Sequence, residues 1–287
     1  MKLATVTFEG RRTVAALEGE TCRLLDEALG TTDMLALIRD FDGLRGSLAS
    51  GGRSVPLASV TLEAPIPRPA RNVFCVGKNY HEHAQEFASS GFDATAKEVV
   101  PEAPVVFTKP STAVIGPGAP IPAHLDPTES VDYEGELAVV IGRGGRGITK
   151  ADALDHVFGY TIVNDVTART LQHKHRQWFI GKGLDGFCPM GPAIVTADEV
   201  PDPTRLHLRT FVNGEKRQDA PVASLIFDIP TLIETLSMGM TLEPGDVIAT
   251  GTPVGVGLGF KPPKFLKKGD VVRIEVDGIG ALENPVG

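Results

Sequence analysis

The sequence predicts a mixed α/β fold that is rich in strands, and three observations lead to this class. Apolar and polar residues alternate with period two along many short segments, as they do in half-buried strands. The chain carries 32 glycines and 22 prolines, which is typical of a turn-rich protein rather than of a helical bundle. Its 287 residues, 42% of them hydrophobic, are enough to bury a sizeable core.

The first 65 residues are predicted to form a small α+β module. Its elements are strand patterns at 2–8 and 13–17 and a helical stretch around 32–39. The proline-rich segment 62–71 is typical of an extended linker. We therefore expect an N-terminal module at 1–65 and a larger domain at 70–287.

Strand patterns dominate the larger domain. A buried strand at 73–77 is followed by a short helix from Asn79 to about Phe87, and the polar, weakly periodic segment 88–103 predicts a mobile loop. Further strands are predicted at 105–108, 131–141, 158–164, 192–195, 206–213, 247–250 and 271–276. Further helices are predicted at 150–157, 166–176 and 228–238.

Charge and cysteine usage exclude several classes of protein. The net charge of −8 argues against nucleic acid or an anionic membrane as the main partner. No apolar run approaches the roughly 20 residues that span a bilayer, and the first residues alternate like a strand rather than like a signal peptide. Cys22, Cys75 and Cys188 are far apart and odd in number, so neither a disulfide framework nor a zinc site is predicted. We expect a reduced cytoplasmic enzyme.

The predicted strand at 131–141 carries three acids near its start. Alternation places Asp132, Glu134 and Glu136 on one face, and the apolar residues that continue this face argue against simple exposure to water. Carboxylates crowded at the mouth of a buried face repel one another. A hard divalent cation would relieve this repulsion. A solvated edge strand whose acids prevent aggregation is the alternative.

Asp165 stands where the strand 158–164 meets the helix 166–176. A common role for Asp at such a junction is helix N-cap. Ligands also converge at strand ends, which makes Asp165 the natural third carboxylate beside Glu134 and Glu136. All-oxygen ligation suits Mg²⁺ or Mn²⁺, and the absence of nearby His or Cys argues against zinc.

The helix after Asn79 carries a second constellation. Asn79 is a suitable N-cap, with Glu82 at the capping-box position. His83 and Glu86 are i,i+3 neighbours on one helix face, whereas His81 lies on another. A Glu that orients an imidazole gives a general base able to activate water, although solvated helices carry such pairs routinely.

Two glycine-rich segments supply further candidates. Lys182 stands between two glycines, where its ammonium could reach into a cleft and bind a carboxylate or an enolate; a surface lysine in a turn is the alternative. Backbone N–H groups of 251–257 and the Thr252 hydroxyl could contact an oxyanion, although this segment alone is only a glycine-rich turn.

The segment 142–147 matches the G-x-G-x-x-G pattern of dinucleotide-binding folds. The helix after it is predicted to begin only at 149–150 and to last about two turns, too late and too short to bind a pyrophosphate. The acids of the preceding strand would repel phosphates. A basic turn is the better interpretation.

Together, six segments in this order resemble the fumarylacetoacetate hydrolase family over about residues 70–285. They are 76–80 with His83 and Glu86, 107–118, 132–137, 159–169, Lys182 with 185–192, and 251–257. The resemblance implies a mixed β-sandwich roll, usually a homodimer, with the site at the mouth of the roll. It also matches the first 65 residues to the small N-terminal module of longer bacterial members.

The resemblance further implies roles for individual residues. The His–Glu pair lies on a segment that orders over bound substrate and activates water, and the lysine binds substrate or stabilises a developing carbanion. The implied residues are the Mg²⁺ or Mn²⁺ ligands Glu134, Glu136 and Asp165, the catalytic residues His83, Glu86 and Lys182, and the substrate-binding residues Arg169, Gln172, Gly251 and Thr252.

Members of this family act on 2-oxo acids through a metal-stabilised enolate. The intact His83–Glu86 pair favours hydrolysis, so we expect C–C bond cleavage in a 2,4-diketo acid such as an acylpyruvate, fumarylpyruvate or diketo-deoxy sugar acid, in aromatic or sugar-acid breakdown. The alternatives are a lyase that decarboxylates oxaloacetate or a related 2-oxo diacid, and an isomerase or tautomerase of a 2-hydroxydienoate. Substrate specificity is expected to reside in 88–103 and 172–180.

Overall fold

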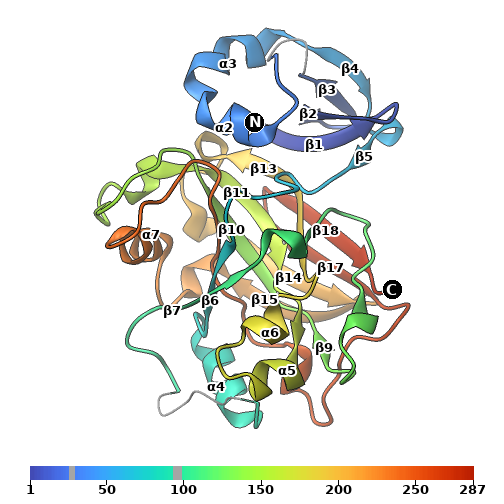
Figure 1. The fold of residues 1–287 in the computed structure, drawn as a ribbon, viewed down its shortest axis with the longest axis vertical. Coiled ribbons are helices and arrows are strands. Elements are labelled where there is room, and N and C mark those ends of the chain that lie inside the picture. The colour runs from blue at the N-terminus through green and yellow to red at the C-terminus, as the bar shows by residue number, and fades with distance from the viewer. Residues whose placement is uncertain (26–29, 93–98) are drawn as a thin grey trace.

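The computed structural model describes residues 1–25, 30–92 and 99–287, and its largest element is a twelve-stranded mixed sheet (Figure 1). Its main path runs in the order β4 (Arg53–Pro56), β3 (Thr21–Leu24), β2 (Arg11–Glu18), β1 (Lys2–Phe8), β13 (Cys188–Thr196), β11 (Val157–Asn164), β10 (Gly135–Ile141), β16 (Val247–Ala249), β6 (Val73–Gly77) and β7 (Val105–Lys109). Beside this path, β5 (Thr61–Leu62) pairs with β1 and β8 (Val114–Ile115) pairs with β13. The predicted strand-rich mixed fold is confirmed.

A second, antiparallel sheet packs against the first. It has four strands in the order β15 (Glu215–Pro221), β14 (His207–Val212), β17 (Val271–Val276) and β18 (Gly280–Pro285), and a separate two-stranded ladder joins β9 (Val131–Asp132) to β12 (Thr167–Ala168). Leu137 and Val139 of β10 share a core with Ile274 of β17, whereas Ala138 and Val140 enter a different core on the opposite face. The alternation along β10 therefore fills two apolar layers, which explains why this strand is buried throughout.

The N-terminal strands lie at one end of the molecule with two helices, α2 (Met34–Arg39) and α3 (Phe41–Ser50) (Figure 1). The Asp33 carboxylate caps α2 by accepting from the backbone N–H of Leu35, close to the predicted helix start. Antiparallel pairing of β1 with β13 continues the large sheet into this module. The division of the chain between residues 65 and 70 stays a prediction.

Among the other described α-helices, three lie at the end of the molecule far from the N-terminal module, and α7 (Ile229–Ser237) lies at one side (Figure 1). The three are α4 (His81–Ser89), α5 (Arg169–Lys174) and α6 (Phe179–Lys182). Short 3₁₀ turns lie at Leu57–Ser59, Ser111–Ala113, Ala123–Leu125, Ala153–His156, Ala197–Glu199, Pro203–Arg205, Val222–Ser224 and Gly257–Gly259. The predicted helix at 150–157 is wrong, because only the 3₁₀ turn forms there, and the helix predicted at 166–176 shrinks to α5 since 167–168 pair as β12.

The prediction of one strand over 131–141 is also wrong. The run breaks at Tyr133 and Glu134, where Asp165 N donates to Glu134 O at 2.8 Å and Glu134 N donates to Asn164 Oδ1 at 3.0 Å. A Cβ at Gly135 would lie 2.3 Å from Thr210 Oγ1, so glycine allows β10 to approach β14 at this break. Because of this break, the side chain of Asp132 points in a different direction from those of Glu134 and Glu136.

Two other predictions concern segments without regular structure. Of the predicted loop 88–103, residues 93–98 lie outside the described residues. In the described chain, no α-helix directly follows the glycine-rich segment 142–147, in agreement with its interpretation as a turn. No helix among the described residues is long and apolar enough to cross a membrane.

Candidate active site

Three carboxylates converge between β10 and the end of β11. Glu134 precedes β10, Glu136 lies on it, and Asp165 follows β11, whose pairing with β10 places Gly135 opposite Asn164. One oxygen from each of the three acids lies within 4.8 Å of the others, and the residues are 5%, 1% and 0% exposed. The structure thus brings together the three residues that the sequence predicted as metal ligands.

Glu136 is the carboxylate that its surroundings compensate least. Burial raises its pKa well above the ordinary value, and the neighbouring Asp165 and Glu134 raise it further. The backbone N–H of Gly251 donates to Glu136 Oε2 at 2.8 Å. Gly251, which was predicted to bind substrate, thus contacts a carboxylate of the triad.

Buried cations neutralise the other two acids. Lys182 Nζ lies 2.8 Å from Glu134 Oε2 and 2.8 Å from Asp165 Oδ2, and Lys109 Nζ lies 2.8 Å from Asp165 Oδ1. Arg169 Nη1 lies 2.6 Å from Glu134 Oε1. Burial acts to raise the pKa of Glu134, but Lys182 and Arg169 outweigh it and lower the pKa to about 2.

Lys182 is not the sparsely covered loop residue that its flanking glycines suggested. It is the last residue of α6 and only 1% exposed. Burial acts to lower the pKa of its ammonium, but Asp165 and Glu134 outweigh this effect and raise the pKa. Lys109, whose ammonium also donates to the carbonyl of Lys182, was not predicted as a site residue, because a lysine that ends a strand is usually solvated.

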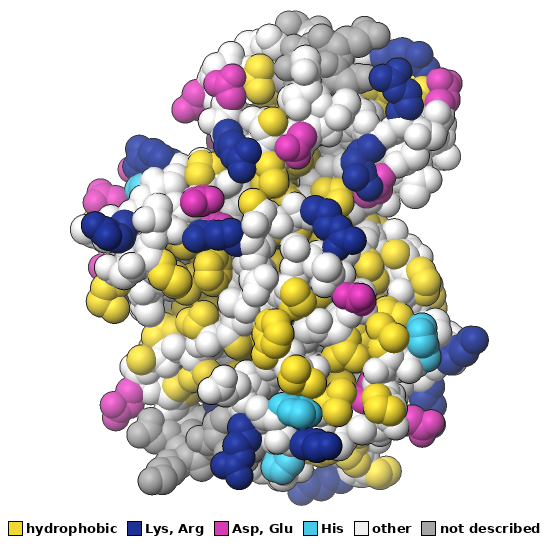
Figure 2. Space-filling view, in the orientation of Figure 1, with side chains coloured by type: hydrophobic (Ala, Val, Ile, Leu, Met, Phe, Trp, Pro, Cys, Tyr) yellow, Lys and Arg dark blue, Asp and Glu magenta, His cyan; other side chains and the backbone are white. Residues whose placement is uncertain are grey.

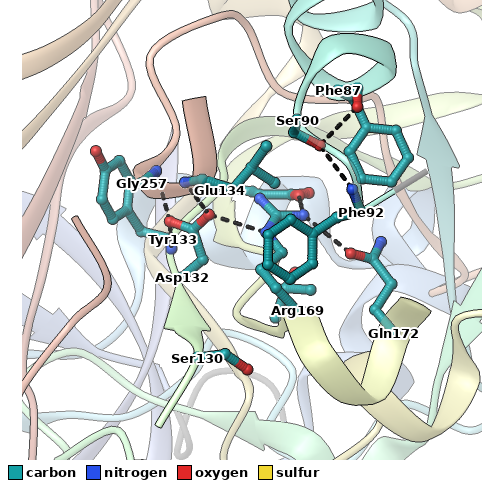
Figure 3. A network of polar contacts seen from close by, with 12 residues as sticks. Phe87, Ser90, Phe92, Ser130, Asp132, Tyr133, Glu134, Arg169, Gln172 and Gly257 are labelled. Carbon is teal, nitrogen blue, oxygen red and sulfur yellow. Dashed lines mark hydrogen bonds and ion pairs between the residues drawn. The ribbon is translucent and has the colours of Figure 1, made fainter. Parts of the chain in front are cut away.

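Asp132 does not join the other acids, contrary to the face predicted from alternation. It accepts from Arg169 Nε at 2.8 Å and from the backbone N–H groups of Gly257 at 2.7 Å and Leu258 at 3.0 Å (Figure 3). Burial raises the pKa of Asp132 despite the guanidinium beside it. Arg169 therefore bridges Asp132 to Glu134, and Asp132 supports the loop that follows β16.

The predicted His–Glu pair lies on α4. His83 is 5% exposed, and its Nδ1 lies 3.0 Å from Glu86 Oε2. The N-cap prediction for Asn79 is wrong: α4 begins at His81, and the Asn79 amide instead contacts backbone groups of Phe227 and Thr250. The N-cap role for Asp165 is wrong too, since α5 begins at Arg169, after β12.

A small cavity of about 20 Å³ lies between α4 and the carboxylates. Its lining includes His83, Glu134, Arg169, Gln172, Lys182 and Thr252, so most of the predicted catalytic and substrate-binding residues share one space. Gln172 accepts from Arg169 at 3.2 Å, and the Thr252 hydroxyl donates to Gly135 O at 3.0 Å. Trp178 lines both this cavity and a larger pocket of about 800 Å³.

These carboxylates fit a hard divalent cation. The converging donors are all oxygens, the set that Mg²⁺ and Mn²⁺ prefer. Asp165 Oδ1 is buried and, although Lys109 lies close, accepts no hydrogen bond from the residues that the structure describes. Glu136, which forms no ion pair among the described residues and whose pKa burial raises, is the carboxylate whose charge a bound cation would compensate.

Comparison with known proteins shows the family to which this chain belongs. Residues 72–287 match the family model for the fumarylacetoacetate (FAA) hydrolase C-terminal region. The chain therefore belongs to the fumarylacetoacetate hydrolase family, whose members are enzymes that include hydrolases, isomerases and tautomerases.

Individual relatives show how widely the reactions vary. The chain is 55% identical to the oxaloacetate tautomerase YisK of Bacillus subtilis over 231 residues, 80% of this chain and 74% of the relative. It is 43% identical to the structure of a fumarylacetoacetate hydrolase from Exiguobacterium antarcticum, with a TM-score of 0.85 and coverage of 100% and 99%. It is 35% identical to a maleylpyruvate hydrolase from Sphingobium sp. SYK-6 in complex with manganese(II) and pyruvate, with a TM-score of 0.82 and coverage of 100% and 98%.

Proposed function

We propose that the protein is a Mg²⁺- or Mn²⁺-dependent enzyme that converts a small 2-oxo acid through its enolate, with keto–enol tautomerisation of an oxaloacetate-type diacid as its reaction. The observation that carries this proposal is the buried triad of Glu134, Glu136 and Asp165, of which Glu134 lines one cavity together with Lys182 and His83. The similarity to an oxaloacetate tautomerase over 80% of the chain supports the choice of reaction.

The charges of the site favour an anionic substrate. Asp132 and the triad supply four buried carboxylates, and the buried cations beside them are Lys78, Lys109, Arg169 and Lys182. Fully ionised, this set has a net charge of 0, and a divalent ion changes it to +2. A 2-oxo acid would bring the compensating negative charge, and buried charge is stable only when it is compensated.

The side chains can move the proton that tautomerisation requires. Because the Glu86 carboxylate accepts from Nδ1 of His83, Nε2 of the neutral imidazole is left as the base. Nε2 takes the proton from C3 of the 2-oxo acid, the C2–C3 double bond forms, and the charge on the C2 oxygen is stabilised by the Lys182 ammonium. Return of the proton to that oxygen gives the enol. The divalent ion, when bound, supplies Lewis-acid stabilisation of the same oxygen.

Hydrolysis of a 2,4-diketo acid is the second candidate, and the buried His83–Glu86 pair favours it. The same imidazole can instead take a proton from water, whose hydroxide adds to the distal carbonyl carbon. The C–C bond then breaks, and the 2-oxo acid enolate is protonated at C3. The similarity to a maleylpyruvate hydrolase over the whole chain supports this alternative.

A substrate panel tests these assignments. The protein is incubated with Mn²⁺ or Mg²⁺ and oxaloacetate, acetylpyruvate, fumarylpyruvate or a diketo-deoxy sugar acid, and products are identified by NMR. Accelerated enol–keto exchange of oxaloacetate without loss of carbon supports the tautomerase. Pyruvate with a second carboxylic acid supports the hydrolase, and CO₂ release supports a decarboxylating lyase. Inertness toward every 2-oxo acid while Mn²⁺ still binds would contradict the proposal.

Homodimer formation and a cytoplasmic location remain proposals. Figure 2 shows hydrophobic side chains gathered over the face below the N-terminal module. Among the described residues, Phe179 is 42% and Ile180 is 50% exposed, and Val106, which lines one pocket with Phe179, is 39% exposed; contiguous exposed apolar patches are typical of surfaces that another protein covers. Analytical ultracentrifugation tests the dimer: a monomer at micromolar concentration would contradict it.

A further inference from the structure

We propose that the loop 255–259 is the docking site that fixes Glu86, and through it His83, and that Gly259 is a positioning residue for the reaction. This inference rests on the proposed function, because it assigns His83 the role of base. It concerns a segment whose residues are neither members of the carboxylate triad nor among the residues given as lining the cavity.

The two oxygens of Glu86 have different partners. Oε2 lies 3.0 Å from His83 Nδ1, and Oε1 accepts from the backbone N–H of Gly255 at 3.0 Å. A carboxylate held at both oxygens has a fixed plane, so the imidazole that it contacts has a fixed orientation as well. The loop thereby holds the carboxylate that contacts the His83 ring.

Gly259 leaves the space that Glu86 occupies. A Cβ at Gly259 would lie 2.0 Å from Glu86 Oε1, 2.5 Å from Cδ and 2.7 Å from Cγ, and these are its three nearest atoms. The φ angle of Gly259 is not in the left-handed region, so an alanine would not strain the backbone. The methyl group of an alanine would collide with the end of the flexible Glu86 side chain and displace its carboxylate from the position beside the loop.

The loop itself is firmly anchored. Asp132 accepts from the N–H groups of Gly257 and Leu258 at 2.7 and 3.0 Å, and the Tyr133 hydroxyl donates to Gly255 O at 2.8 Å. Leu258 also packs in the apolar cluster that contains Phe87 of α4. Asp132 also contacts Arg169, which in turn contacts Glu134 (Figure 3). The buried Asp132–Arg169 pair therefore connects the loop 255–259 to the carboxylate triad.

Gly259→Ala tests this role, with Gly239→Ala as the matched control because a Cβ at Gly239 meets nothing within 4 Å. Misorientation of a general base costs on the order of 100-fold in rate, so we expect kcat of Gly259→Ala to fall by about that factor, to the level of Glu86→Ala. KM, the Mn²⁺ dissociation constant and the unfolding midpoint should stay at the control values. The double variant Glu86→Ala/Gly259→Ala should be no slower than Glu86→Ala, since the colliding side chain is gone.

The outcomes separate this inference from the proposed function. If His83→Ala and Glu86→Ala both keep the parental kcat, the base assignment fails and the proposed mechanism with it. If those variants are slow but Gly259→Ala keeps the parental kcat, only the positioning role of the loop is overturned. It is likewise overturned if Gly259→Ala weakens Mn²⁺ binding or lowers the unfolding midpoint relative to Gly239→Ala, or if the double variant is slower than Glu86→Ala.

Discussion

Replacement of Asp132 by asparagine should destabilise the protein strongly, because this buried carboxylate has four hydrogen-bond donors around it. They are Arg169 Nε and the backbone N–H groups of Tyr133, Gly257 and Leu258, at 2.7 to 3.0 Å. Asparagine keeps the size of the side chain but removes its charge and directs an NH₂ group toward donors. At least one of these N–H groups would then lack an acceptor.

The expected loss is about 3 kcal/mol in the free energy of unfolding. Removing one partner of a buried ion pair costs roughly 3–5 kcal/mol. The lower end applies here because Glu134 still contacts Arg169 at 2.6 Å, so the guanidinium keeps one carboxylate partner when the charge of Asp132 is removed. With a urea dependence near 3 kcal/mol/M, the midpoint should fall by about 1 M.

The assay is urea unfolding followed by circular dichroism, with Asp277→Asn as the control. Asp277 contacts Arg209 at 2.8 Å, the same distance, but the two side chains are 56% and 32% exposed. Solvent screens such a pair, so Asp277→Asn should leave the midpoint unchanged. Equal shifts in the two variants, or a shift for Asp132→Asn below about 0.3 M, would refute the argument that burial makes the first pair important.

Three further predictions follow from the site and its surroundings. Dialysis against EDTA should abolish turnover, and Mn²⁺ or Mg²⁺ should restore it; full turnover in the chelator would contradict metal dependence. Burial raises the pKa of Glu63, but hydrogen bonds from Arg12 and Thr7 outweigh it and lower the pKa. Glu63→Gln should therefore lower the unfolding midpoint at neutral pH, and the difference should vanish as pH falls through the lowered pKa, which a series of unfolding curves checks. Burial raises the pKa of the Cys188 thiol to about 12, so a thiol reagent at pH 8 should modify it only at the rate of unfolding.

Sequence alternation predicted many of the strands, among them β1, β11 and β17. It missed β15, whose sequence EKRQDAP is largely polar, and β18, whose sequence GALENP begins with glycine and ends with proline. Both strands are held by pairing with β14 and β17. It also missed the break at Tyr133 and Glu134, because the hydrogen bonds that interrupt the strand come from residues about 30 positions away. Local patterns carry no information about such tertiary competition.

The site residues could be predicted because their motifs are short and ordered, whereas the supporting residues could not. Lys109 acquires its role only by reaching Asp165, 56 positions further along the chain. Gly259 looks like any turn glycine until its distance to Glu86 is known. For Asp132, the period-two pattern predicted the wrong face, since the strand break turns it toward Arg169.

The asymmetry of the carboxylate triad leads to a last prediction, for Glu136→Gln. Lysine or arginine nitrogens contact Glu134 and Asp165, but within the described ranges no ion pair reaches Glu136. Burial and the acidic neighbours Asp165 and Glu134 raise the pKa of Glu136 in the folded protein. At a pH above the pKa of the unfolded state, such a carboxylate lowers the stability of the fold. Without metal at pH 7, the glutamine variant should therefore unfold at higher temperature than the parent, while Mn²⁺, which stabilises the parent, should stabilise the variant much less. A metal-free variant that unfolds below the parent would show that Glu136 is compensated by something other than a bound cation.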